Sequence, residues 1–152
     1  MYQRFIFFFL ILFSLSFCTS SQNNVSKLNP VNNIITKIDM NLSAFGVESD
    51  DFPSIEIHLD FQNDTNICIK SFYNPAYKDS TYRLSKIEIQ KIYDLLKDVN
   101  FDDFKKEYSV ENSDQPTSTI IIFTTTNQYT IKDYGLLGDY PLQEIYKIVY
   151  KL

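Results

Sequence analysis

The chain has 152 residues, with 14 Lys and Arg against 19 Asp and Glu, and its formal net charge is −5 at pH 7. This acidity argues against nucleic acid as a partner, because phosphate binding needs a cationic surface. The three glycines of the sequence form no glycine-rich phosphate loop, which argues against nucleotide chemistry.

The first residues predict an export signal. Arg4 precedes an apolar run over residues 5–13, which is too short to span a membrane and suits a signal-peptide core. Leu15-Ser16-Phe17-Cys18 resembles the bacterial lipobox, although that pattern has a small residue in place of Phe17. We therefore expect a lipoprotein-type signal peptide over residues 1–17, cleavage before Cys18 and a lipid on Cys18.

Cleavage after Ser20 is the alternative, because Cys18 and Ser20 also satisfy the small-residue rule for ordinary signal peptidase. It would give a soluble secreted protein, in which Cys18 could form a disulfide with Cys68. In either case residues 18–33 are rich in Ser and Asn and predict a flexible tether. A single domain over residues 34–152 would follow.

Alternation of apolar and polar residues predicts strands over residues 34–44 and 55–61. Turn residues after Asp60 predict a hairpin to a third strand over residues 67–73, and residues 81–84 suggest a short strand.

Two helices are expected. Ser85 and Glu88 form a capping-box pattern before apolar residues at helical spacing, and Asn100 is a plausible end. Residues 101–108 suggest a short packed turn or helical piece. Pro141 opens a final helix, whose predicted apolar face comprises Leu142, Ile145, Val149 and Leu152.

Between these helices, residues 117–125 and 129–133 predict a second hairpin. The elements together predict an α+β domain in the order β-β-β-(β)-α-β-β-α. Its antiparallel sheet would have about five to six strands, with two main helices packed on one face.

From Pro53 onward, the order of several short motifs resembles an uncharacterised family of bacterial envelope proteins, known as a domain of unknown function (DUF6438). The motifs are Asp64 in a turn, Leu84-Ser85 before a helix, Phe101 and Phe104 with Tyr108, residues 114–117 before a strand, and Tyr134-Gly135. The resemblance implies an exported α+β domain and no particular activity.

Glu56, His58 and Asp60 share one face of the second predicted strand and are weak candidates for a metal site. Metal ligands must converge on one point, so a solvated polar face is the favoured interpretation. Cys68 and His58 could form a thiol pair, but Cys68 lies in an apolar strand and is better interpreted as packing. The sequence predicts no cofactor, no metal and no catalytic residue.

The loop over residues 134–140 is the favoured binding segment, with Tyr134, Leu136, Leu137 and Tyr140 as candidate contacts, because aromatic and apolar loop residues often anchor partners. The competing interpretation is that both leucines fold back onto the core.

These observations predict a lipid-anchored binding or interaction module of the bacterial cell envelope. Its partners would be the membrane, through the lipid, and an unidentified envelope protein or ligand, without nucleic acid. Two alternatives stay open: an envelope hydrolase using paired carboxylates, and an inhibitor of a secreted or periplasmic enzyme.

Overall fold

The computed structural model describes residues 34–47 and 49–151. The predicted signal peptide, the predicted tether, Cys18 and Leu152 lie outside the described residues. Within them, neither helix combines the length and the hydropathy needed to cross a bilayer.

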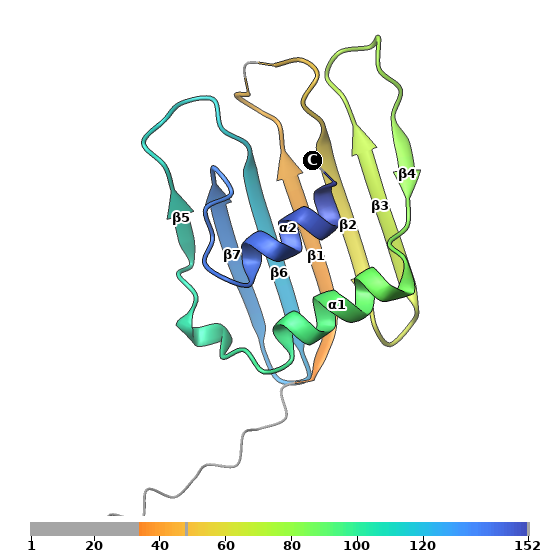
Figure 1. Ribbon diagram of the computed structural model, residues 1–152, viewed down its shortest axis with the longest axis vertical. Helices are drawn as coiled ribbons and strands as arrows, with labels where there is room; N and C mark the ends of the chain where they lie inside the picture. The colour runs from red at the N-terminus through yellow and green to blue at the C-terminus, as the bar shows by residue number, and fades with distance from the viewer. Residues whose placement is uncertain (1–33, 48, 152) are drawn as a thin grey trace, which may run out of the picture.

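One sheet of seven strands forms the body of the domain, and two helices cover one of its faces (Figure 1). The strands are β1 (Ile35–Ser43), β2 (Ser54–Asp60), β3 (Thr65–Ser71), β4 (Ser80–Tyr82), β5 (Glu107–Ser109), β6 (Thr117–Thr124) and β7 (Gln128–Tyr134). The helices are α1 (Lys86–Leu96) and α2 (Leu142–Tyr150), with a short 3-10 helix η1 (Phe101–Asp103). Across the sheet the strand order is β4-β3-β2-β1-β6-β7-β5.

The predicted α+β class and the two main helices are confirmed, whereas the strand count and the uniformly antiparallel pairing need correction. The sheet has seven strands rather than five or six, and β5 pairs parallel with β7. The sequence predicted a turn or helical piece for residues 101–108. Its first part is η1, but Tyr108 lies in the three-residue β5, which is too short to show an alternating pattern.

A bulge changes which face of β1 is buried. Ile38, Met40 and Leu42 face the core as the alternation predicted. At the start of the strand, however, Ile35 is 2% exposed and Ile34 is 52% exposed. The register against β6 shifts between Ile35 and Lys37, and one extra residue moves the preceding side chains to the opposite face.

The core lies between the sheet and the helices. On the sheet side it contains Ile55, Ile57 and Leu59 of β2 and Ile120 and Ile122 of β6. The predicted face of α2 is buried at Leu142, Ile145 and Val149, and α1 buries Ile92 and Leu96.

The start of α1 has the predicted capping box. The Ser85 hydroxyl accepts a hydrogen bond from the Glu88 N–H at 3.2 Å, and the Glu88 carboxylate accepts one from the Ser85 N–H at 2.6 Å. These bonds satisfy two backbone donors that a helix start leaves open. They also lower the pKa of Glu88, most of all through the backbone bond from Ser85.

A fully buried carboxylate, Asp133, joins β7 to the segment that leads into α2. Its oxygens accept hydrogen bonds from the Leu137 N–H at 2.9 Å, the Gly138 N–H at 2.6 Å and the Tyr146 hydroxyl at 2.8 Å. Burial and the nearby Asp133 carboxylate both raise the pKa of Tyr146. The ring of Tyr146 stacks on that of Tyr150 at 5.7 Å between centroids.

We predict that Asp133→Asn destabilises the domain. The amide supplies one acceptor oxygen where the carboxylate supplies two, so a buried donor loses its partner, at a cost of about 1–3 kcal/mol. Asp139→Asn is the matched control, since Asp139 is exposed and accepts one hydrogen bond from the Tyr108 hydroxyl at 3.0 Å. Urea unfolding should show the larger loss for Asp133→Asn. Equal losses for the two variants would contradict the assigned role of Asp133.

Candidate functional site

The edge strand β5 covers only part of β7. It pairs with Lys132, Asp133 and Tyr134, and the Lys132 N–H donates to the Lys106 carbonyl at 2.9 Å. In the part of the chain that the structure describes, no strand lies beside residues 128–131 on this side of β7. Four residues of strand edge, about 13 Å long, are therefore open.

Open backbone groups face outward along this edge. Within a strand, the N–H and C=O of successive residues point to opposite sides. Because the Lys132 N–H points toward β5, the backbone groups of Thr130 and Gln128 point the same way. They form a short template for another extended chain.

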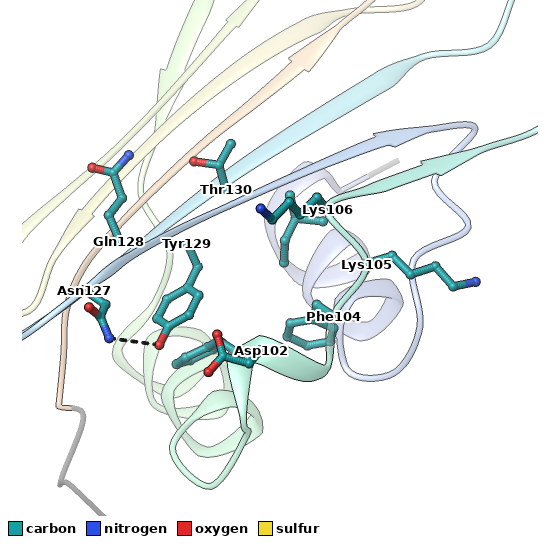
Figure 2. A pocket seen from close by; sticks show the side chains of 10 residues that line it. Asp102, Phe104, Lys105, Lys106, Asn127, Gln128, Tyr129 and Thr130 are labelled. Atoms are coloured by element: carbon teal, nitrogen blue, oxygen red, sulfur yellow. Dashed lines mark hydrogen bonds between the residues drawn. The ribbon is translucent and has the colours of Figure 1, made fainter.

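A hollow of about 540 Å³ lies beside this edge, between β7 and the segment that contains η1 (Figure 2). Its aromatic part consists of Phe101, Phe104 and Tyr129, with ring centroids 5.0 Å apart for Phe101 and Tyr129. Phe101 is 5% exposed, so it forms the floor. The polar lining includes Asp102, Lys106 and Thr130.

The turn after α1 opens the hollow. The Asn100 side-chain oxygen accepts a hydrogen bond from the Asp102 N–H at 3.4 Å, and its amide donates to Asp103 at 2.9 Å. This cap starts η1, which directs Phe101 inward and leaves Asp102 exposed. The chain rejoins β7 only at Lys106, so the intervening residues stand away from the strand edge.

The two lysines of this segment point in different directions. Figure 2 shows the Lys106 side chain directed toward β7 and the Lys105 side chain directed away from it. The Lys105 ammonium lies 5.4 Å from the centre of the Tyr108 ring, a cation–π distance. Lys105 also lines the hollow, but its ammonium lies over the Tyr108 ring, so Lys106 is the lysine whose side chain is directed toward the open edge.

This geometry suits binding of an extended chain. The strand edge offers backbone hydrogen bonds, the aromatic floor offers an apolar surface, and Lys106 offers a charge. Asp102 is the one carboxylate among the lining residues, whereas glycoside hydrolysis uses a facing pair. Among the described residues, no three His, Cys, Asp or Glu side chains lie close enough to hold a metal ion.

The structure divides the predicted binding loop into inward and outward residues. Leu136 is half-buried and packs against the core, while Leu137 is 51% and Tyr140 74% exposed. Tyr134 is half-buried, and its hydroxyl accepts a hydrogen bond from the Gln115 N–H at 3.2 Å. Tyr140 and Phe104 line a second hollow of about 320 Å³, so this loop borders the segment that forms the strand-edge hollow.

The weak metal candidates do not converge. His58 Nδ1 lies 2.9 Å from the Asp39 carboxylate, Asp60 accepts hydrogen bonds from Gln62 and Asn63 in the following turn, and Glu56 is exposed.

Cys68 pairs with Ile57 in the strand register and is fully buried, whereas its predicted partner His58 pairs with Ile67. Successive residues face opposite sides of a sheet, so Cys68 and His58 do not meet. Burial raises the pKa of the Cys68 thiol to about 11, which keeps it protonated at neutral pH.

Sequence reasoning missed the strand-edge hollow as a site. It treated Phe101 and Phe104 as packing residues and attached no role to Lys106 or Tyr129. One signal was present: Lys105-Lys106 is a pair of positive charges directly after an aromatic residue in an acidic chain. Its meaning depends on where β5 ends, which is a property of the tertiary structure.

A family model described as "Domain of unknown function (DUF6438)" matches residues 51–152, which is 102 of the 152 residues (152 − 51 + 1 = 102). The matched region contains every element of the hollow and excludes β1. No curated protein matches the chain, and no solved structure matches it.

We predict different effects for two neighbouring leucines of the loop. Leu136→Ser should lower the free energy of unfolding by about 1–3 kcal/mol, because it removes a partly buried side chain from the core. Leu137→Ser, at an exposed position, should change it by less than about 0.5 kcal/mol. Chemical denaturation of both variants measures this difference, and equal losses would show that Leu137 also packs in solution.

Proposed function

The chain belongs to the DUF6438 family, and we propose that it is an exported, lipid-anchored module of the bacterial cell envelope that binds an extended segment of a partner protein. The observation that carries the binding role is the open edge of β7 at residues 128–131 beside an aromatic hollow. Addition of a peptide strand to a sheet edge is a common mode of peptide recognition, in which the backbone supplies affinity and side-chain pockets supply specificity.

The placement of the edge agrees with a membrane anchor at Cys18. The Thr125 N–H donates to the Ile34 carbonyl at 3.0 Å, so β1 begins beside the turn that leads into β7. The open edge therefore lies at the end of the sheet where β1 begins (Figure 1). Ile34 lies sixteen positions after Cys18 (34 − 18 = 16), a distance along the chain that spans at most about 55 Å when extended. A bound partner would lie close to the membrane.

The alternatives receive less support. A hydrolase needs two carboxylates facing one cleft, and the strand-edge hollow is lined by Asp102 alone. Asp103 and Asp139 both line the second hollow, but Asp103 accepts a hydrogen bond from the Asn100 amide and Asp139 accepts one from the Tyr108 hydroxyl. An inhibitor of an envelope enzyme is compatible with strand addition, and in that case the bound segment would belong to the enzyme.

We predict that Cys18 carries the lipid. The full chain expressed in a bacterium should sediment with membranes, and the intact mass of the mature protein should correspond to a chain that starts at Cys18 with a diacylglyceryl group. Cys18→Ala should release the protein from the membrane fraction. An unmodified wild-type chain that starts at Ser21 would contradict the anchor and leave the binding role intact.

We predict that Thr130→Pro weakens strand addition. Proline removes the Thr130 N–H, which points into the hollow and away from β6, and edge strands tolerate proline. Random peptides selected by display against the wild-type domain should bind the variant about tenfold more weakly, because the variant lacks one N–H that donates to the added strand. Isothermal calorimetry measures the affinity, and urea unfolding checks that the variant is folded.

The selected peptides provide a second control. N-methylation of amides that bond β7 should abolish binding, whereas methylation of the alternate amides should leave it unchanged. Failure to select any peptide, or equal loss at all methylated positions, would overturn strand addition. Sedimentation of the protein alone tests a competing occupant, because a dimer that Thr130→Pro dissociates would assign this edge to a second copy of the chain.

A further inference from the structure

We propose, on the basis of the strand-binding function above, that the open edge of β7 selects segments in which an acidic side chain meets Lys106 and a neighbouring apolar side chain covers the aromatic floor. The inference names the chemistry of the partner: an acidic, apolar extended segment.

The register of the sheet determines where an added side chain points. Residues opposite each other in neighbouring strands project from the same face. Tyr129 and Ile131 face the helix side, where they align with Ile122 and Ile120 of β6. A residue of the bound segment opposite Tyr129 therefore projects toward Phe101 and Phe104, and its neighbours project to the outer face.

The aromatic floor selects an apolar side chain at that position. Phe101 lies between Phe104 and Tyr129, with ring centroids at 6.4 Å and 5.0 Å. Phe104 and Tyr129 are half-buried, so part of each ring is open to the hollow. A branched aliphatic or aromatic side chain would remove this surface from water, which favours binding.

Lys106 selects the charge. Its carbonyl accepts the hydrogen bond from the Lys132 N–H at the point where β5 begins. Its side chain therefore stands at the end of the open edge that borders β5, and it is directed toward β7 (Figure 2). None of the ion pairs between described residues involves Lys106. An acidic side chain at this end of the bound segment would be attracted to the ammonium.

Asp102 restricts where the acid can lie. It lines the same hollow on η1, whereas Lys106 stands where β5 begins. An acidic side chain near η1 would meet a like charge, which disfavours that placement. The two charges together favour one position for the acid, next to β5.

The test uses a short host peptide with an alternating Thr-Val core, acetylated and amidated, and carrying Asp, Asn or Lys at one end or the other. Calorimetry with the wild-type domain should show about three- to fivefold tighter binding of the best Asp peptide than of its Asn counterpart, the size expected for a partly exposed ion pair. The Lys counterpart should bind more weakly than the Asn peptide. This preference should decrease as salt is raised.

Charge reversal on the protein completes the test. Lys106→Glu should invert the order, so that the Lys peptide binds tightest. Lys105→Glu is the matched control, with the same charge change on a side chain that faces Tyr108, and it should leave the order unchanged. Equal binding of all peptides to the wild type, still weakened by Thr130→Pro, would overturn charge selection and keep strand addition. No binding of any peptide would overturn both.

Discussion

The buried carboxylate of Asp133 holds the segment that leads into α2 against β7, beside the residues of β7 that β5 covers. A charge without access to water is costly unless its oxygens are hydrogen-bonded, and here two backbone N–H groups and the Tyr146 hydroxyl supply those bonds. The bonds hold residues 137 and 138 against the C-terminal end of β7. They attach α2 to the same point through Tyr146. Asp139 then receives the Tyr108 hydroxyl of β5 at 3.0 Å. β5 is thereby attached beside residues 132–134 of β7. No described strand is attached beside residues 128–131 on that side.

An open strand edge favours aggregation, because its unpaired backbone groups can pair with any exposed extended chain. This edge is only four residues long, η1 stands beside it, and Lys106 places a positive charge at the end that borders β5. These features restrict pairing to a short segment of suitable chemistry. At the opposite side of the sheet, the three-residue β4 pairs with residues 68–70 of β3, and no described strand lies beside residues 65–67 there. The open part of each edge is therefore short, and the hollow lined by Phe101, Phe104 and Tyr129 lies beside the β7 edge.

The parts of the fold that depend on local pattern were predictable from the sequence, and the parts that depend on pairing were not. Ser85 and Glu88 predicted the start of α1, because a capping box is a contact between residues close in sequence. The burial of Ile35 in place of Ile34 depends on a bulge against β6, which lies more than eighty residues later in the chain. Leu136 and Leu137 look equivalent in sequence, but Leu136 adopts a left-handed conformation with φ of 57° after Gly135, and only Leu136 turns toward the core. The hollow also could not be predicted from local pattern, because it lies where the pairing between β5 and β7 stops.

Charge illustrates why overall composition and local function differ in this protein. The net charge of −5 argues against a polyanionic partner, yet it says nothing about a single side chain at a strand edge. At the ionic strength of a cell, exposed charges are screened beyond about 8 Å, so a bound segment would respond to Lys106 and Asp102 more strongly than to the distant acidic residues. A short acidic segment that presents one carboxylate to Lys106 can therefore bind a protein of the same overall sign. An extended polyanion would instead meet many acidic side chains at close range.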